Sequence, residues 1–337
     1  MSLVHAGLLV LAWLLSTVLT YILLRYAIRQ GVLDNPNERS SHSVPTPRGG
    51  GLGIVLATLV VAVVLHRTGS VSTRLLLALG GGGLLVAATG TWDDLRTIPA
   101  RWRFPLHLMA SAGAVALLGG LPPLRFGSAV VDLGWIGHIL AVLAITWLLN
   151  LYNFMDGIDG IAGGEALTVA GIGGGLFALA GQWPPAILLW AMGAAAVGFL
   201  HWNWPPARIF MGDGGSGFLG YAFGVLALAG AREPCHIWPL AILLIAFVAD
   251  ATVNLIRRVI SGQKWYTAHC NHAYQHAARR WGHRPVTMSV MLINLFFLGP
   301  LAYLAAARPS WGALLFVLSF SVLALVARCL RAGEMPD

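Results

Sequence analysis

The sequence predicts an all-α polytopic membrane protein with about 10–11 transmembrane helices. Charged residues make up only 10% of the 337 residues and hydrophobic residues 57%, whereas water-soluble domains carry about 25% charged residues. The mean hydropathy is +0.75, and apolar runs of about 20 residues, enough to cross a hydrocarbon core of roughly 30 Å, recur along the whole chain. Because such runs must satisfy their backbone polar groups internally, they are expected to be helices.

Eleven apolar segments form the predicted helices, and residues 1–337 are expected to make one integral membrane domain. The first segment lacks the basic flank and the cleavage site of a signal peptide, so it is predicted to remain as a mature helix. In order, the segments are Val4–Tyr26, Gly51–Leu65, Arg74–Thr91, Phe104–Gly120, Gly134–Tyr152, Ile161–Leu179, Pro184–Leu200, Gly214–Ala229, His236–Ile256, Thr287–Ala306 and Trp311–Leu330.

The distribution of positive charge predicts the orientation of the chain in the membrane. Sixteen of the 21 Lys and Arg residues fall in one set of alternate connections and five in the other. Since positive charge accumulates in cytoplasmic loops, the larger set is predicted to be cytoplasmic, with the N-terminus outside and the C-terminus inside. The net charge of +8 then reflects topology and attraction to anionic lipid headgroups, and gives no support for nucleic-acid binding.

Polar residues concentrate in the five predicted cytoplasmic connections, whereas the external connections are short. The first cytoplasmic connection reads VLDNPNERSSHSVPTPRGGG, and its prolines and glycines forbid a continuous helix. Arg39, His42 and Arg48 in this connection are candidates for contacts with phosphate. For the two arginines, an anchoring role at the cytoplasmic face is an equal alternative.

The second connection carries two adjacent carboxylates, Asp93 and Asp94, in TGTWDDLRTIPARWRF. A helix C-terminus disfavours anions, because the macrodipole already places partial negative charge there. Adjacent carboxylates also repel each other unless a cation is present. The pair therefore suggests a metal site or a catalytic base. The alternative is a solvated loop in which Arg96 and Arg101 pair with the carboxylates.

The third connection, LLNLYNFMDGIDGIAGGEAL, contains no Lys or Arg that could neutralise its two aspartates. Asp156 and Asp159 are three residues apart, which predicts that both lie on one helical face, with Asn153 extending the same row. Gly157 and Gly160 leave room for a ligand beside the backbone. The spacing does not fit a calcium loop, and a helix N-cap role would explain only one of the two aspartates.

The fourth connection, HWNWPPARIFMGDGGSGFLGY, contains a match to G-x-G-x-x-G at Gly212–Gly217. No strand or βαβ unit surrounds the match, so a dinucleotide-binding fingerprint is rejected. What remains is a glycine-rich turn that enters a helix and offers backbone N–H groups to an anion. Asp213 would oppose that anion unless a divalent metal bridges the two. Alternatively, Asp213 caps the helix.

The fifth connection is the longest, and it carries six basic residues in RRVISGQKWYTAHCNHAYQHAARRWGHRPVT. Histidines that are cationic or donate hydrogen bonds suit a site that faces phosphate. The connection holds His269, His272, His276 and His283.

One acidic residue, Asp250, falls within a predicted span. A carboxylate inside the membrane is a functional candidate by default. A structural ion pair with Arg257, which lies two turns further along the same helix face, is an equal alternative.

Carboxylates gathered at one membrane interface, with glycines beside them and histidines nearby, indicate a divalent cation and a phosphorylated substrate. An ion-coupled membrane transporter is the alternative function. It would need polar groups near the bilayer midplane, and only Asp250 qualifies.

Five segments in order, RSSHSVPTPRGGG, the Asp pair, NFMDGIDG, NWPPARIFMGDGGSG and AHCNHAYQ, resemble the polyprenyl-phosphate N-acetylhexosamine-1-phosphate transferases, the MraY/WecA-like superfamily of glycosyltransferase family 4. The resemblance implies transfer of an N-acetylhexosamine-1-phosphate from a UDP-sugar to undecaprenyl phosphate, with release of UMP and a requirement for Mg²⁺, for which Mn²⁺ is an alternative. It places the enzyme in the bacterial inner membrane with its active site facing the cytoplasm. The implied partners are the UDP-sugar, undecaprenyl phosphate and membrane lipid, with no nucleic acid; a homodimer is left open.

The same resemblance implies roles for individual residues. Asp213 and Asp94 are expected to bind Mg²⁺, and one of the adjacent aspartates to deprotonate or orient the lipid phosphate. The implied catalytic residues are Asp93, Asp94, Asp156, Asp159 and Asp213. The implied substrate-binding residues are Arg39, His42, Arg48, Asn153, Asn203, Gly212, His269 and His272. The HxxHxYQ form of the histidine motif is more similar to transferases that start O-antigen or related surface glycans, including those for 6-deoxy sugars.

Overall fold

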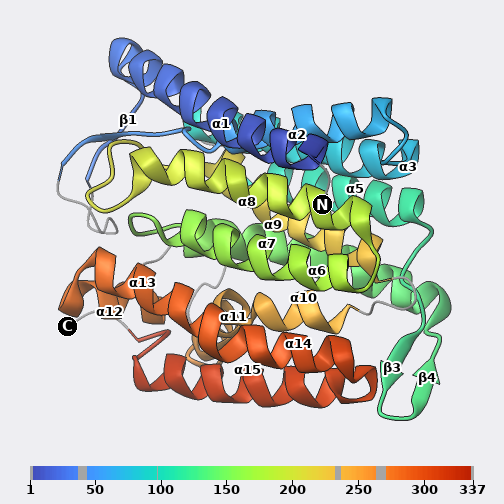
Figure 1. Ribbon diagram of the computed structural model, residues 1–337. Coiled ribbons are helices and arrows are strands. Elements are labelled where there is room, and N and C mark those ends of the chain that lie inside the picture. Colours follow the sequence, from blue (N-terminus) through green and yellow to red (C-terminus); the bar gives the residue numbers. More distant parts are fainter. Residues whose placement is uncertain (1–2, 37–43, 97, 232–236, 263–270, 335–337) are drawn as a thin grey trace.

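The structure is a computed structural model, and it describes residues 3–36, 44–96, 98–231, 237–262 and 271–334 (Figure 1). Within these residues the helices are α1 Leu3–Gln30, α2 Leu52–Arg67, α3 Thr73–Leu76, α4 Gly83–Leu95, α5 Ala100–Leu118, α6 Gly134–Met155, α7 Ile161–Leu179, α8 Trp183–Asn203, α9 Asp213–Gly230, α10 Trp238–Leu243, α11 Ile245–Ile260, α12 Ala273–Trp281, α13 His283–Ile293, α14 Gly299–Ala307 and α15 Gly312–Cys329. Two π-helical segments, η1 Leu77–Gly82 and η2 Asn294–Leu298, continue neighbouring helices, and η3 Pro309–Trp311 is a 3₁₀ turn.

Two small antiparallel strand pairs lie outside the helices. β1 Leu33–Asp34 pairs with β2 Thr46–Pro47, and β3 Leu124–Phe126 pairs with β4 Ala129–Val131. The first pair joins residues near the two ends of the proline-rich connection. The second pair forms a hairpin at the opposite end of the bundle (Figure 1).

The predicted all-α polytopic membrane fold is confirmed. Each of the eleven predicted segments corresponds to a helix, or to a rod of successive helices, in the described part of the chain. Among the described residues, seven helical rods are long and apolar enough to cross a membrane, and Leu52–Arg67 is a shorter apolar helix. The seven are Leu3–Gln30, Thr73–Leu95, Gly134–Met155, Ile161–Leu179, Trp183–Asn203, His283–Ala307 and Pro309–Cys329.

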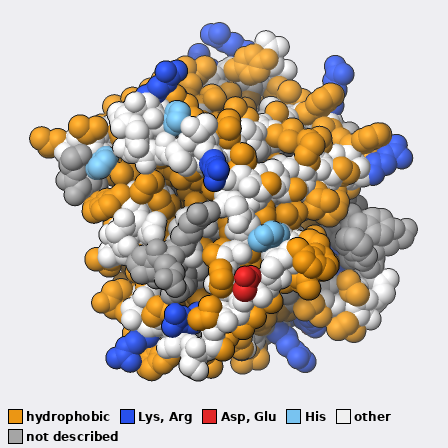
Figure 2. All heavy atoms as spheres, turned by 90° about the vertical axis from the view of Figure 1, so that its right-hand side faces the viewer, with side chains coloured by type: hydrophobic (Ala, Val, Ile, Leu, Met, Phe, Trp, Pro, Cys, Tyr) orange, Lys and Arg blue, Asp and Glu red, His pale blue; other side chains and the backbone are white. Residues whose placement is uncertain are grey.

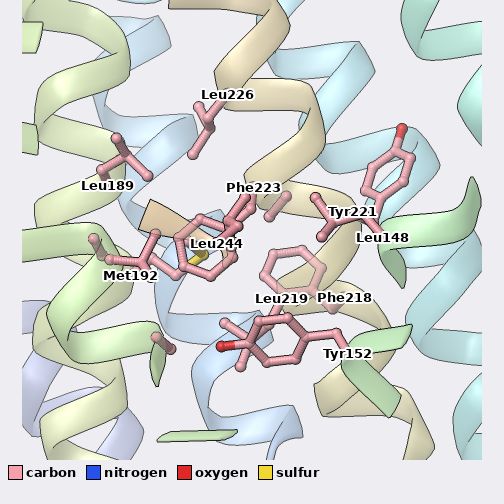
Figure 3. Packing of buried hydrophobic residues seen from close by; sticks show 14 of the residues in the cluster. Leu148, Tyr152, Leu189, Met192, Phe218, Leu219, Tyr221, Phe223, Leu226 and Leu244 are labelled. Carbon is pink, nitrogen blue, oxygen red and sulfur yellow. The ribbon is translucent and has the colours of Figure 1, made fainter. Parts of the chain in front are cut away.

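Helix α9 lies at the centre of the bundle and is buried along nearly its whole length. Its aromatic side chains Phe218, Tyr221 and Phe223 pack against the surrounding helices (Figure 3). Tyr221 satisfies its hydroxyl by donating to the carbonyl of Ala78 at 2.7 Å. Small residues let helices approach closely in a membrane protein, and a Cβ added at Gly220 would lie 2.5 Å from the carbonyl oxygen of Leu148. Although α9 is central, it is not among the seven rods above.

The two ends of the bundle carry different elements. The chain's described C-terminus, α12 and the β1–β2 pair lie at one end, and the β3–β4 hairpin lies at the other, towards which the N-terminus of α1 points (Figure 1). The face at the hairpin end is largely hydrophobic, with few acidic side chains (Figure 2). Termini at opposite ends agree with an odd number of crossings; the cytoplasmic orientation of the polar end stays a prediction.

Candidate active site

Three helix ends meet at the polar end of the bundle and bring together residues that are far apart in the sequence. The last turn of α4 carries Asp93 and Asp94, α9 begins at Asp213, and the last turn of α6 carries Asn153. The backbones of α4 and α9 touch, because a Cβ added at Gly90 would lie 2.5 Å from both the carbonyl oxygen of Asp213 and the amide nitrogen of Gly214. The predicted carboxylates therefore converge through contact between main chains.

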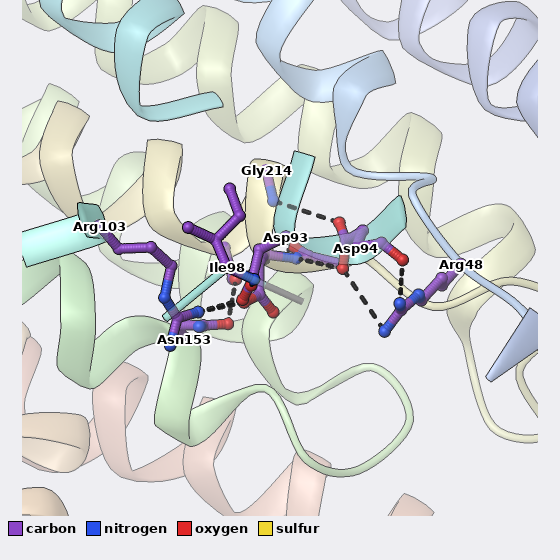
Figure 4. Close-up of polar contacts among 10 residues, drawn as sticks. Arg48, Asp93, Asp94, Ile98, Arg103, Asn153 and Gly214 are labelled. Carbon is purple, nitrogen blue, oxygen red and sulfur yellow. Dashed lines mark hydrogen bonds and ion pairs between the residues drawn. The ribbon is translucent and has the colours of Figure 1, made fainter. Parts of the chain in front are cut away.

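Asp94 lies against the N-terminus of α9 (Figure 4). Its Oδ1 accepts a hydrogen bond from the backbone N–H of Asp213 at 3.2 Å, and its Oδ2 accepts from Gly214 at 3.5 Å. The positive end of the α9 dipole stabilises a carboxylate in this position. Gly212 precedes the helix with φ +78°, and a Cβ there would lie 2.5 Å from the Asp94 Oδ2, so the turn requires glycine. Asp213 does not cap α9 with its own side chain.

Two arginines contact the carboxylates. Arg48 donates through Nη2 to the Asp94 carbonyl, and its Nη1 lies 3.8 Å from the Asp94 Oδ1. Arg103 donates through Nη1 to the Asp93 Oδ2 and lies 3.2 Å from the Asp213 Oδ2, so it bridges two helix ends. The alternative prediction, that Arg96 and Arg101 pair with the Asp pair, is wrong: a rigid helix α5 carries Arg103 to the carboxylates instead. Sequence reasoning missed Arg103, because ten residues separate it from Asp93.

Asn153 is held beside Asp213 by a hydroxyl that the sequence did not single out. Ser216 in the first turn of α9 donates to the Asn153 Oδ1 at 2.9 Å, and its hydroxyl lies 3.1 Å from the Gly212 carbonyl. The Asn153 side chain also interacts with the Asp213 carboxylate. The glycine-rich turn was the available signal for Ser216, since the serine lies within it.

The prediction that Asp156 and Asp159 share one helical face is wrong. Helix α6 ends at Met155, because Asp156 leaves the helical conformation with ψ 49°, and α7 begins only at Ile161, after Gly160 with φ +77°. The two carboxylates consequently take different surroundings. Asp156 interacts electrostatically with Asp213 and Asp94. The Asp159 Oδ2 instead accepts a hydrogen bond from the backbone of Ala207 at 3.0 Å.

Asp159 and Asn203 connect the loop between α6 and α7 to α13 and to the loop between α8 and α9. The Asp159 Oδ1 lies 3.2 Å from His283 Nδ1, and the Asp159 carbonyl accepts from Thr287 at 2.8 Å. The buried Asn203 accepts from the backbone N–H of Gly160 at 2.9 Å and donates to the Ile209 carbonyl at 2.8 Å. These contacts fix the loop that carries Asp156.

His272 is buried, and its Nδ1 lies 3.2 Å from the Asp250 Oδ1. The alternative in which Asp250 pairs with Arg257 is wrong, since Arg257 binds the C-terminal residues Ala332 and Glu334. Three further predicted substrate contacts lie outside the described residues: Arg39, His42 and His269.

The carboxylates of the site lie close enough to affect one another's ionisation. Partial burial, together with the negative charges of Asp213, Asp94 and Asp159, raises the pKa of Asp156 well above its usual range. A nearby cation would reverse the effect of those charges. The site therefore favours either a proton or a positive ion next to Asp156.

This shift predicts how the stability of the metal-free protein depends on pH. Because the folded state holds the Asp156 proton more tightly than the unfolded state, the free energy of unfolding falls as pH rises from the ordinary carboxyl pKa, about 3.8, through the raised pKa. We expect Asp156→Asn to remove part of this slope and to raise the Tm at neutral pH. Thermal unfolding in detergent with EDTA over a pH series measures both. Asp132→Asn, next to the hairpin, is the control, and parallel slopes for wild type and Asp156→Asn would contradict the prediction.

Comparison with known proteins identifies the family. A family model described as glycosyl transferase family 4 matches residues 76–231, which include the ends of α4, α6 and α9 that form the site. A probable undecaprenyl-phosphate N-acetylglucosaminyl 1-phosphate transferase of Bacillus subtilis (strain 168) is 32% identical over 295 residues, covering 83% of this chain and 79% of that protein. A decaprenyl-phosphate N-acetylglucosaminephosphotransferase of Mycolicibacterium smegmatis is 30% identical over 342 residues, covering 89% and 82%.

A third relative differs in its named substrate. A phospho-N-acetylmuramoyl-pentapeptide-transferase of Symbiobacterium thermophilum is 33% identical over 255 residues, covering 69% of this chain and 75% of that protein. Relatives named for different sugars are thus similar in sequence to this chain, and all are named as transferases of a phosphorylated sugar. Together with the membrane fold and the convergent carboxylates, these matches show that the chain is a phosphoglycosyltransferase that belongs to glycosyl transferase family 4, the MraY/WecA-like family.

Proposed function

We propose that this enzyme transfers an N-acetylhexosamine-1-phosphate from a UDP-sugar to undecaprenyl phosphate at the cytoplasmic face of the bacterial inner membrane and releases UMP. The observation that carries the proposal is the convergence of Asp93, Asp94 and Asp213 with Arg48 and Arg103 at one end of a membrane bundle. A lipid acceptor requires a site at the interface, because its phosphate lies at the level of the headgroups. The named acceptors of the relatives are polyprenyl phosphates.

We propose that Asp213 and Asp94 bind Mg²⁺, for which Mn²⁺ is an alternative. Among the residues that the structure describes, no three His, Cys, Asp or Glu side chains are already grouped as metal ligands. The two carboxylates of Asp94 and Asp213 suit Mg²⁺, which usually takes one or two carboxylates and completes its coordination with phosphate oxygens and water. When bound, the ion supplies neutralisation of the diphosphate charge.

The chain's own residues are proposed to position two anionic substrates against their mutual repulsion. An oxygen of the acceptor phosphate attacks the phosphorus that carries the sugar, the bond from that phosphorus to the UMP oxygen breaks, and UMP leaves. Asp93 orients or deprotonates the acceptor phosphate. Arg48 and Arg103 neutralise phosphate oxygens as charge shifts, which is the main catalytic contribution available in phosphoryl transfer. Asn153 and the Asp156 loop support the nucleotide side of the site.

The sugar and the pathway are a finer part of the proposal. The HxxHxYQ motif, which runs from His269 to Gln275, supports an enzyme that starts an O-antigen or a related surface glycan. A 6-deoxy N-acetylhexosamine is the proposed sugar. Relatives named for N-acetylglucosamine make that sugar the direct competitor in any test.

The test is UMP release by the purified protein with undecaprenyl phosphate and Mg²⁺. The donor panel contains UDP-N-acetylglucosamine, UDP-N-acetylgalactosamine and their 6-deoxy analogues, and each is assayed with and without lipid and with EDTA. We expect release that depends on lipid and Mg²⁺, with the highest kcat/KM for a 6-deoxy donor. Absence of lipid-dependent release with every donor would contradict the transfer reaction, whereas a preference for UDP-N-acetylglucosamine would contradict only the sugar assignment.

A further inference from the structure

Asp250 caps a helix to which it does not belong. It lies in α11 and is buried, and its Oδ1 accepts from the backbone N–H of Ala273 at 2.9 Å and lies 3.2 Å from the His272 Nδ1. Its Oδ2 accepts from the N–H of Tyr274 at 3.0 Å. A carboxylate at a helix N-terminus satisfies otherwise unpaired N–H groups and is favoured by the dipole. Asp250 therefore fixes the start of α12 from inside the bundle.

The C-terminal turn, Arg331–Glu334, holds the same segment from the outside. The N–H of Gly333 donates to the carbonyl of Asn271 at 2.7 Å, one residue before His272. The buried Ala332 packs with Ala273 in a small apolar cluster separate from the main core. The turn thus contacts the start of α12 through both its backbone and its side chains.

Arg257 and Arg331 keep the C-terminal turn in place. Arg257 donates through Nη1 to the Ala332 carbonyl at 2.8 Å and through Nη2 to the Glu334 Oε1 at 2.7 Å. The Nε of Arg331 donates to the Glu334 Oε2 at 2.7 Å. These hydrogen bonds, from Arg331 and from Arg257, lower the pKa of Glu334, so its carboxylate is charged at neutral pH. His276 in α12 also lies 3.2 Å, through Nε2, from the Glu334 carbonyl.

The start of α12 rests directly on the loop that carries Asp156. The Tyr274 hydroxyl donates to the carbonyl of Phe154 at 3.0 Å. A Cβ added at Gly157 would overlap this hydroxyl and would lie 3.0 Å from the Gln275 Nε2, so the two segments are in contact. A displacement of α12 would therefore be transmitted to the residues on either side of Asp156.

We propose that Asp250 and the C-terminal turn Arg331–Glu334 form a two-sided clamp that positions Asn271–Tyr274 and, through Tyr274, the Asn153–Asp156 segment of the active site. Asp250 contacts the start of α12, and the C-terminal turn contacts the start of α12 and Arg257, so we assign both parts of the clamp as positioning elements. The kinetic consequence rests on the proposed function; the effect on the Asn153–Asp156 segment does not. When the clamp is weakened, a smaller fraction of molecules holds Asn271–Tyr274 in contact with the Asn153–Asp156 segment.

The kinetic test uses variants of both parts of the clamp, Asp250 and the C-terminal turn. A truncation after Leu330 removes the turn, Glu334→Ala removes its ion pairs, and Asp250→Asn weakens the inner cap. We expect kcat/KM to fall between about 10- and 100-fold, mainly through kcat, as for a small misplacement of reacting groups. Arg328→Ala is the control that leaves the clamp intact, because it removes a positive charge from the exposed end of α15. Wild-type kcat/KM in both Glu334→Ala and the Leu330 truncation would overturn the proposal.

Hydrogen–deuterium exchange tests the clamp without using activity. We expect amides of residues 150–160 and 273–281 to exchange faster in the clamp variants, with unchanged exchange in the central helix α9. Faster exchange in α9 would mean global destabilisation and would overturn a specific clamp. Unchanged exchange in residues 150–160 would overturn the transmission step. If the wild-type protein released no UMP, the proposed function would fail, and the exchange pattern would still decide for or against the clamp.

Discussion

Asp213→Asn is expected to lower kcat by about 10²- to 10³-fold, the scale on which loss of one electrostatic stabiliser of the transition state is measured. Asparagine keeps the size of the side chain and the first residue of α9, but it removes the negative charge from the point where α4, α6 and Arg103 meet. The Asp213 side chain does not cap α9, so the folded structure should persist. UMP release and thermal unfolding of the same detergent-purified sample measure the two effects.

A second measurement separates a metal ligand from a residue that acts in another way. An ion that binds only the folded state raises the Tm as its concentration increases. We expect Mg²⁺ to raise the Tm of the wild type but not that of Asp213→Asn. Asp132→Asn makes the same chemical change in a turn near the hairpin, where its carboxylate accepts from Gly134 at 2.8 Å, and should behave as wild type. Full activity of Asp213→Asn would remove this residue from the catalytic site.

Gly90→Ala is expected to be nearly as damaging, although it adds only a methyl group. The new Cβ would lie 2.5 Å from the Asp213 carbonyl oxygen and from the Gly214 amide nitrogen, and backbone atoms cannot rotate away as a flexible side chain can. The end of α4 must therefore move away from α9, which pulls the Asp94 carboxylate off the two amides that it binds. A displacement of about 1 Å costs on the order of 100-fold in rate, and overpacking costs roughly 1–3 kcal/mol of stability.

Gly81→Ala is the matched control for this change. It lies in the same rod as Gly90, and no atom lies within 4 Å of the Cβ that it would add. Since alanine is favoured over glycine inside a helix by about 1 kcal/mol, Gly81→Ala should keep activity and stability. UMP release and the Tm distinguish the two variants. Equal kcat for Gly90→Ala and wild type would show that the helix contact does not set the position of Asp94.

The sequence was sufficient to predict the helices, because the length of each apolar segment can be read directly from the chain. It was also sufficient to predict that the carboxylates meet, because alternate connections between membrane helices lie on the same side of the membrane. Asp93, Asp94 and Asp213 could be placed at one end without any knowledge of how the helices pack. Arg103 could not be assigned to them, because the position of its guanidinium depends on where α5 starts and on how α5 packs against the neighbouring helices.

The errors have equally specific causes. A spacing of three residues indicates a shared face only where a helix continues, and α6 ends at Met155, before both aspartates. The alternative that pairs Asp250 with Arg257 rests on their place on one helix. The true partners come from α12 and from the last residues of the chain, which no pattern along a single helix can reveal.

The central position of α9 has a consequence for how the protein is made. A helix enters the bilayer readily when its own hydrophobicity is sufficient, and helices assemble afterwards. Helix α9 starts with Asp213 and a run of glycine and serine, and it is not among the described rods that are apolar enough to cross alone. We therefore expect its insertion to depend on α6 and α4, which contact it in the finished bundle. Damage to those contacts should reduce the yield of inserted protein before any effect on turnover can be measured.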